Sequence, residues 1–251
     1  MSTQHTMGLV SISFRQHSPR EILEAMQKTS LTCIEWGSDV HAPYGDTERL
    51  DEIVRLQKQY GITCCSYGTY FRLGETPLEE LEGYIRAAKK LGTNVLRLWC
   101  GKGAVGMTEE EKVRFFELCR TAAAIVKEHD VIFCMENHMK TFTERREDTL
   151  LLMEQVNSPH FQMYWQPFQW QNEEENIKNA RAIAPFAKRV HVFNWEGNQK
   201  FPLADATSAW RAYLKEFTSP LPLLLEFMPK GTLEELPTES KALETILGGN
   251  I

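Results

Sequence analysis

The segment SISFRQHSPRE, residues 11–21, decides between the two α/β folds that this chain could adopt. It follows the first expected strand and contains no glycine. A doubly wound open sheet normally binds a nucleotide at a glycine-rich turn in this position, because only glycine lets the backbone approach the phosphates closely. The segment instead ends in Ser18-Pro19-Arg20-Glu21, which has the capping residues of a helix start. It therefore disfavours the open sheet.

The rest of the chain repeats the same alternation of apolar run and amphipathic stretch. Eight runs are expected to be strands, at 8–13, 31–36, 62–67, 94–99, 131–136, 161–166, 189–194 and 222–227. Helices are expected from 18 onward and at 46–61, 76–92, 108–130, 143–156, 173–188, 205–217 and 231–247, the last interrupted by Pro237. Strands joined by helical crossovers form a parallel sheet, and eight repeats predict a (β/α)8 TIM barrel. No linker divides the chain, so we expect a single domain over 1–251.

The composition fits a soluble globular protein, with 42% hydrophobic and 25% charged residues among 251. A net charge of -6 gives no reason to expect a nucleic-acid partner, since that affinity rests largely on Lys and Arg. No apolar stretch approaches the roughly 18 residues of a membrane helix, and the N-terminus MSTQHT lacks a signal pattern. The six cysteines show no CxxC spacing and are expected to be reduced core residues. We therefore expect a cytoplasmic protein without a membrane partner.

Polar residues at the strand ends point to a site, because reactive groups of such barrels lie at the carboxyl ends of the strands. Glu136 and Glu226 close the runs VIFCME and PLLLE, Gln166 ends FQMYWQ, and His191 lies in RVHVFN. A carboxylate closing an apolar run is partly desolvated unless it is paired, either with a metal ion or with Arg or Lys. A barrel-end salt bridge is the alternative for either glutamate alone. Two glutamates and a histidine at one rim favour a shared site.

Glu136, Gln166, His191 and Glu226 are predicted metal ligands. Two carboxylates, one amide oxygen and one imidazole suit Mn2+ or Mg2+, and Co2+ also fits, whereas a zinc site would usually recruit more histidine. Because strand side chains alternate, Gln166 ligates only if it points inward. If Trp165 points inward instead, only three protein ligands remain.

With three further motifs the chain resembles the xylose isomerase-like TIM-barrel superfamily over essentially its whole length. The motifs are Cys33-Ile34-Glu35, His41-Ala42-Pro43 and Leu96-Arg97-Leu98-Trp99. The resemblance implies that the glutamates matching Glu136 and Glu226 bind the metal and move the substrate proton. It also implies a homo-oligomer, although nothing identifies the interface.

Two features depart from patterns of this superfamily. Its sugar epimerases commonly carry Asp-x-x-His where this chain has Gln166-Pro167-Phe168-Gln169. With Gln166 the charges of a divalent ion and two glutamates sum to zero, so the ion would be held less tightly and be a stronger Lewis acid. Endonuclease IV relatives need additional histidines, and Ser66-Tyr67-Gly68 and Trp99-Cys100-Gly101 supply none. A nuclease is therefore disfavoured.

The expected reaction is isomerisation or epimerisation of a small polyhydroxy carbonyl compound. One of Glu136 and Glu226 removes the proton next to the carbonyl, the metal stabilises the enediolate oxygen, and the other glutamate returns a proton. A metal-dependent lyase or dehydratase would use the same rim. A non-catalytic sugar-binding barrel is a further alternative, but it would have no need of two proton-carrying glutamates.

The remaining candidates concern the substrate pocket. Predicted substrate contacts are His138, Gln169, Trp99, Glu35, His41 and Lys200. Expected aromatic walls, in an otherwise neutral pocket, are Phe14, Tyr67, Trp99, Trp165, Phe168 and Trp195, although each ring could equally fill the interface between barrel and helices. Arg15 and Lys200 could hold a phosphate. No glycine-rich turn lies near the seventh and eighth expected strands, however, and this disfavours a phosphorylated substrate.

Overall fold

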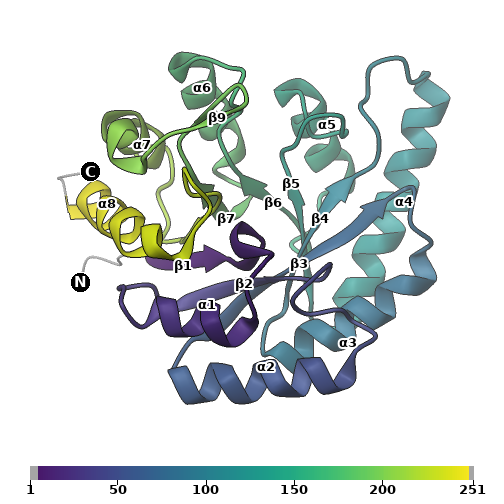
Figure 1. Cartoon of the computed structure of the whole chain (residues 1–251). Helices are drawn as coiled ribbons and strands as arrows, with labels where there is room; N and C mark the ends of the chain where they lie inside the picture. Colours follow the sequence, from purple (N-terminus) through teal and green to yellow (C-terminus); the bar gives the residue numbers. More distant parts are fainter. Residues whose placement is uncertain (1–4, 249–251) are drawn as a thin grey trace.

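A closed barrel of eight parallel strands forms the centre of the molecule in the computed structural model, which describes residues 5–248 (Figure 1). The strands follow one another around the barrel in the order β1, β10, β7, β6, β5, β4, β3 and β2. Their bounds are β1 Thr6–Val10, β2 Cys33–Gly37, β3 Thr63–Leu73, β4 Val95–Cys100, β5 Ile132–Glu136, β6 Phe161–Trp165, β7 Ala187–Val192 and β10 Pro222–Leu225. The predicted TIM barrel is confirmed.

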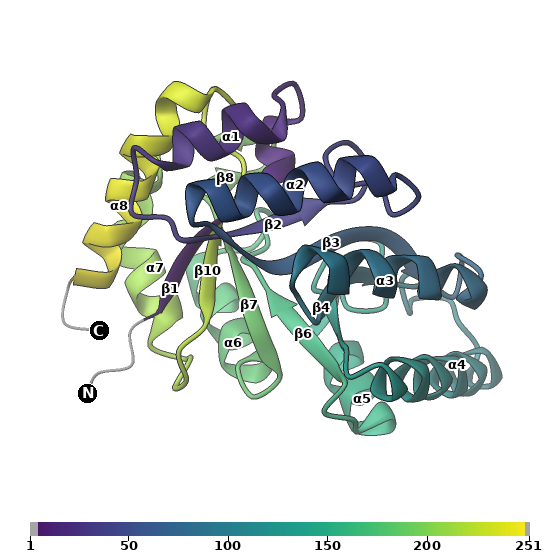
Figure 2. The same ribbon diagram turned by 90° about the horizontal axis from the view of Figure 1, so that it is seen from below.

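Helices surround this barrel on the outside (Figure 2). They are α1 Pro19–Met26, α2 Thr47–Tyr60, α3 Leu81–Leu91, α4 Glu109–Glu128, α5 Arg146–Val156, α6 Glu173–Ile183, α7 Thr207–Leu214 and α8 Leu236–Gly248. The expected capping box forms at α1, where Ser18 accepts from the Glu21 backbone and Glu21 accepts from the Ser18 backbone. Gly61 ends α2 in the left-handed conformation at φ 66°, which glycine adopts without strain.

Several predicted boundaries were wrong. The first strand stops at Val10, and residues 11–14 form the 3-10 helix η1 (Ser11–Phe14). The third strand runs on to Leu73, with a register shift against β4 between Gly68 and Arg72. The predicted helix 173–188 ends at Ile183, because β7 takes up the chain from Ala187.

The segment after β7 and the start of the last helix also differ from expectation. A short hairpin, β8 (Trp195–Glu196) with β9 (Gln199–Lys200), follows β7 and was not predicted. Pro237 does not interrupt the last helix but lies in the first turn of α8, where its missing N–H costs no intrahelical hydrogen bond. Residues 1–4 and 249–251 of the predicted domain lie outside the described part.

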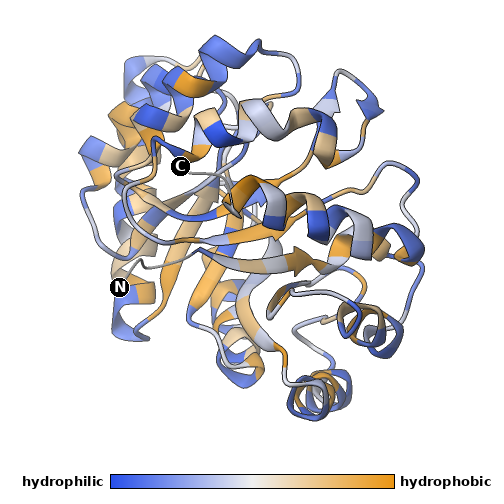
Figure 3. Ribbon diagram, turned by 90° about the vertical axis from the view of Figure 1, so that its left-hand side faces the viewer, coloured by the Kyte–Doolittle hydropathy of each residue, from blue (hydrophilic) through white to orange (hydrophobic). Residues whose placement is uncertain are grey.

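Apolar side chains fill both the barrel interior and the layer between barrel and helices. Hydrophobic residues concentrate on the strands and on the inward helix faces, whereas the outward faces are hydrophilic (Figure 3). Cys33, Cys134 and Tyr164 belong to the interior cluster. All six cysteines are free, and five are buried, as expected for reduced core residues. Among the described helices, none is both long and apolar enough to cross a membrane.

Candidate active site

A cavity of about 420 Å³ lies at the carboxyl ends of the barrel strands. This catalytic cavity, as we call it, is lined by residues that end or follow β1, β3, β4, β5, β6, β7 and β10. Six predicted site residues line it: Trp99, Glu136, His138, Gln166, Gln169 and Glu226. The strand ends therefore bring together the groups that the sequence placed at the rim.

His191, fully buried on β7, lies between the other three predicted ligands. Its Nδ1 is 3.4 Å from Gln166 Oε1, 3.4 Å from Glu226 Oε2 and 3.6 Å from Glu136 Oε1. Its Nε2 faces Glu35 Oε1 at 3.6 Å and has no hydrogen-bond partner among residues 5–248. Three oxygens from three different strand ends thus surround one ring nitrogen.

Gln166 points inward, and Trp165 does not. Trp165 packs against the aromatic residues of α7, and its indole N–H donates to Asn179 Oδ1 at 2.9 Å. Asn137 fixes Gln166 from the neighbouring strand end. Its Oδ1 accepts from the Gln166 backbone at 2.9 Å, and its carbonyl accepts from Gln166 Nε2 at 3.2 Å. Because the amide nitrogen is held there, the amide oxygen faces His191.

Arg97 is a buried cation at this site that was not among the predicted site residues. It is 2% exposed, and it donates from Nε to Glu35 at 3.3 Å and from Nη1 to Glu136 at 3.1 Å. Trp99 donates its indole N–H to the same Glu136 oxygen, Oε2, at 2.7 Å. A side chain on Gly68 would lie 2.6 Å from Glu35 Oε1 and 2.9 Å from Arg97 Nη2, so this pair needs a glycine beside it. The signal in the sequence was an arginine inside an apolar strand, which requires a buried partner.

Glu35 lies beneath the catalytic cavity and does not line it. It is fully buried and accepts hydrogen bonds from Ser66 Oγ at 2.8 Å and Tyr164 OH at 2.6 Å, in addition to Arg97. The structure therefore places it as a support for Arg97 and His191 rather than on the cavity wall, where a substrate contact was expected.

The family is shown by a match along most of the chain. Residues 15–219 match the family described as xylose isomerase-like TIM barrel. The chain belongs to this family.

The proteins to which this chain is similar include a dehydratase and an epimerase. A 3-dehydroshikimate dehydratase of Bacillus anthracis is 23% identical over 198 residues, covering 74% of this chain and 71% of the relative. A crystal structure of the probable dehydratase from the same organism has a TM-score of 0.80 at 17% identity, over 96% of this chain and 99% of that one.

Two further solved structures are similar in fold. A structure of IOLI protein with a bound zinc atom has a TM-score of 0.78 at 15% identity, over 98% of this chain and 99% of that one. D-psicose 3-epimerase of Clostridium cellulolyticum, solved with D-tagatose, has a TM-score of 0.68 at 13% identity, over 96% and 98%. These likenesses show the barrel fold.

Two other predicted contacts of this xylose isomerase-like barrel are not on the cavity wall. His41 is buried, with Nδ1 3.0 Å from Ser11 Oγ and Nε2 3.1 Å from the His17 carbonyl, and burial lowers its pKa. It ties η1 to the loop after β2. Lys200 lies on the hairpin with Nζ over the Trp195 ring at 5.3 Å and the Phe227 ring at 4.9 Å, and both rings line the cavity.

The aromatic wall differs in membership from the expected one, with Tyr70, Phe193 and Phe227 added, and the cavity is not neutral. Trp99, Phe168 and Trp195 line it, whereas the other expected rings, Phe14, Tyr67 and Trp165, are buried elsewhere. Besides Arg97, Arg15 lines the mouth, where it donates to Tyr70 OH and, at 2.9 Å, to Asp39. Arg97 lies on β4, whereas Arg15 follows η1 and meets Tyr70 on the long strand β3.

Charge and burial at the site shift the pKa values of the two rim glutamates in opposite directions. Burial raises the pKa of both carboxyls, but at Glu136 the nearby Arg97 and His191 outweigh it and hold the pKa well below the ordinary value. At Glu226 burial prevails over the attraction of His191, and the pKa rises to about 7. Burial lowers the pKa of His191, but Glu226, Glu136 and Glu35 together raise it to about 10.

The donor set suits a divalent cation. Three oxygens and one nitrogen converge at the catalytic cavity, and the Gln166 oxygen is oriented toward them by Asn137. Within residues 5–248, His, Cys, Asp and Glu side chains nowhere gather in threes as a formed metal site. Metal coordination by Glu136, Gln166, His191 and Glu226 therefore stays a prediction.

Proposed function

We propose that this barrel is an isomerase or epimerase that moves a proton next to the carbonyl group of a small polyhydroxy compound. The observation that carries the proposal is the convergence of Glu136 and Glu226 on the cavity floor. Glu136 ends β5 and Glu226 directly follows β10, and β6 and β7 separate these strands. Both carboxylates lie within 3.6 Å of the same His191 nitrogen. Two carboxylates reaching one cavity from different sides can remove and return a proton at neighbouring carbons or opposite faces.

The contacts of the two glutamates differ, which suggests different roles. Glu136 Oε2 is committed to Arg97 and Trp99, so this carboxylate is held ionised and fixed in position. The Glu226 side chain has only the His191 ring near it as an ion-pair partner within the described residues. An ionised carboxylate can only accept a proton, so we assign removal of the proton next to the carbonyl to Glu136. We assign the return of a proton to Glu226, whose pKa of about 7 lets its carboxyl carry one. The Arg97 and Trp99 donors keep Glu136 oriented through both steps.

Four residues, Glu136, Gln166, His191 and Glu226, would hold a divalent cation. Mn2+ or Mg2+ fits the oxygen-rich set best, and Co2+ or Zn2+ remains an option on the histidine. Such an ion would supply Lewis-acid polarisation of the substrate carbonyl. The zinc atom in the structure of IOLI protein supports this assignment by analogy of fold.

A dehydratase is the second candidate function, because the curated relative at 23% identity is one. Elimination of water also begins with removal of a proton next to a carbonyl. The hydroxyl on the next carbon then leaves with a proton supplied by an acid, and a double bond forms between the two carbons. Glu136 as base and Glu226 as acid could serve in either reaction, so the products must decide between the two candidate functions.

The proposed setting is the cytoplasm, with a small sugar-like molecule as substrate and neither nucleic acid nor membrane as partner. The six free cysteines and the net charge of -6 support this setting.

Product analysis tests the proposal. Purified protein would be analysed for bound metal and then incubated, with and without added Mn2+ or Mg2+, with a panel of ketoses, aldoses and hydroxylated keto acids. We expect an isomer or epimer of equal mass. A product lighter by one water, absorbing in the ultraviolet as an unsaturated carbonyl, would establish the dehydratase instead. Binding without any conversion across the panel would contradict both enzymatic candidates.

A further inference from the structure

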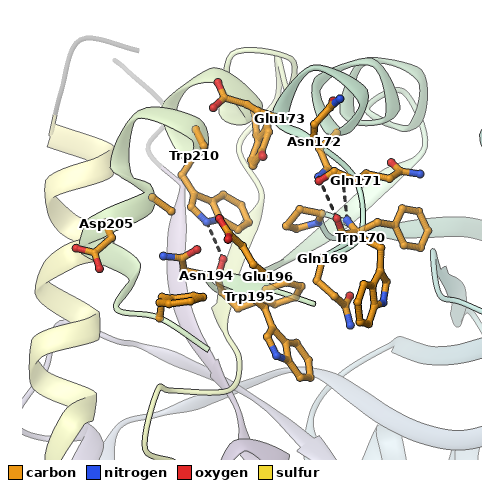
Figure 4. A pocket seen from close by; sticks show the side chains of 18 residues that line it. Gln169, Trp170, Gln171, Asn172, Glu173, Asn194, Trp195, Glu196, Asp205 and Trp210 are labelled. Carbon is orange, nitrogen blue, oxygen red and sulfur yellow. Dashed lines mark hydrogen bonds between the residues drawn. The ribbon is translucent and has the colours of Figure 1, made fainter. Parts of the chain in front are cut away.

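A second cavity, of about 650 Å³, opens beside the catalytic cavity (Figure 4). We call it the outer cavity. It lies between the loop after β6, the loop and hairpin after β7, and α7. Phe168, Gln169, Phe193 and Trp195 line both cavities. The two spaces are therefore separated only by this shared wall.

Two loops are joined to form the rim of the outer cavity. The Gly197 backbone in the hairpin donates to the Gln169 carbonyl at 2.9 Å. The Trp170 ring covers Gly197, whose φ is 55°. A Cβ at this position would lie 3.1 Å from the ring, so both the backbone conformation and the space favour glycine. Trp170 itself is 57% exposed. The rim thus presents the exposed Trp170 ring, and the hydrogen bond between Gly197 and Gln169 holds the two loops beside it together.

The chemistry of the outer cavity excludes an anionic ligand. Among the described residues that line it, none is Lys, Arg or His, while Glu173, Glu196 and Asp205 are acidic. Figure 4 shows Asp205 and Glu173 at different edges of the cavity, so the negative charge is spread around it. A phosphate or carboxylate would be repelled. Carboxylates and side-chain amides accept hydrogen bonds from hydroxyl groups, and aromatic rings pack on the C–H faces of sugars.

One donor in the shared wall lacks a partner. Trp195 Nε1 is buried and makes no hydrogen bond with any other described residue. This nitrogen is closed to solvent, so a ligand oxygen would reach it only after the Trp195 side chain turns toward the cavity. A sugar hydroxyl or ring oxygen would supply that acceptor.

We propose that the outer cavity binds a second, neutral sugar ring of the substrate, so that the enzyme acts on a keto-disaccharide or glycoside rather than on a monosaccharide. The proposal rests on the proposed function for the ring in the catalytic cavity. Both volumes lie within the range of ligand pockets, and the shared wall would lie along the bond between the rings. The second ring would be recognised by hydroxyl donors toward Glu196 and Asp205 and by the Trp170 face.

A filling substitution with a matched neighbour tests the proposal. Ala209 lines the outer cavity but not the catalytic one, whereas the adjacent Ser208 on α7 is exposed and lines neither. Saturation-transfer NMR and calorimetry would compare maltose, cellobiose, lactose and sucrose with glucose and glucuronate. We expect at least one disaccharide to bind about tenfold more tightly than glucose, a difference of about 1.4 kcal/mol. Ala209→Trp should remove this preference, and Ser208→Trp should keep it.

The outcomes separate this proposal from the proposed reaction. In Glu226→Gln, which should be inactive, the disaccharide preference should remain, because binding in the outer cavity does not need proton transfer. The proposal is overturned if none of the disaccharides binds better than glucose, if glucuronate binds as well as they do, or if Ala209→Trp leaves the preference unchanged. Failure of the reaction alone would leave the preference intact.

Discussion

Replacing Arg97 by methionine should destabilise the barrel strongly, because it removes from two buried carboxylates their arginine partner and leaves only His191 beside them as an ion-pair partner among the described residues. Arg97 is 2% exposed and donates to Glu35 and Glu136 at 3.3 and 3.1 Å. Methionine keeps much of the apolar volume but none of the charge. Removing one partner of a buried ion pair typically costs about 3–5 kcal/mol. We expect a loss of this size in the free energy of unfolding at about pH 7.

The loss should depend on pH in a defined direction. In the native protein His191 and Arg97 outweigh burial and lower the pKa of Glu35 to about 2 from 4.5. Its contribution to stability is therefore present above about pH 4.5 and lost as the pH falls toward 2. In Arg97→Met the guanidinium no longer opposes the effect of burial, so the pKa values of Glu35 and Glu136 should rise. Their protonation should then relieve part of the destabilisation, and the difference from the native protein should shrink at about pH 5.

Urea denaturation followed by circular dichroism measures both effects. Arg181→Met is the matched control, because Arg181 makes a two-pronged pair with Glu216 at 2.9 and 3.0 Å but is 68% exposed in its side chain. Exposed pairs contribute about 1 kcal/mol or less. If Arg97→Met costs no more than Arg181→Met, or if its cost grows on acidification, the buried pair does not hold the site as described.

Two further substitutions test the site. Gln166→Asp introduces the carboxylate that the family's epimerases commonly carry here, and it should tighten Mn2+ binding by about tenfold or more, as measured by calorimetry. An unchanged affinity would mean that residue 166 does not ligate the ion. Gly68→Ala places a methyl group 2.6 Å from Glu35 Oε1 and 2.9 Å from Arg97 Nη2, and overpacking of this kind costs about 1–3 kcal/mol in urea denaturation. Gly45→Ala meets nothing within 4 Å and should be nearly neutral; equal effects of the two changes would argue against the tight Glu35–Arg97 contact.

The barrel could be predicted from the sequence because its signals are local. Apolar runs alternate with stretches that begin in residues such as Ser18 and Thr108, and both of these form capping boxes. The length of β3 was not predictable in the same way, since it depends on a register shift against β4 that only the neighbouring strand imposes. The two-residue strands β8 and β9 are likewise too short to show a periodic pattern.

The grouping of the candidate residues was predictable where position on a strand determines it. Glu136, Gln166 and Glu226 each lie at or just after the end of a strand, and a common rim follows from the fold. The inward direction of Gln166 was open until the strand end was placed beside Asn137.

Long-range partners could not be predicted. Arg97 pairs with Glu35 from a strand 62 residues earlier, and no local pattern shows that the two meet. The placement of Glu35 under the cavity, rather than on its wall, has the same origin: its position depends on Ser66 and Tyr164 from other strands.

The central claim is that Glu226 and Glu136 carry a proton to and from the carbon next to a carbonyl. The most direct measurement is NMR detection of solvent deuterium entering that carbon when a converted substrate is incubated with the protein in heavy water. We predict incorporation by the native protein and by Glu216→Gln, a control at a residue that lines neither cavity. We predict a loss of about 10²-fold or more in Glu226→Gln and Glu136→Gln. Undiminished incorporation by both of these variants would contradict the account.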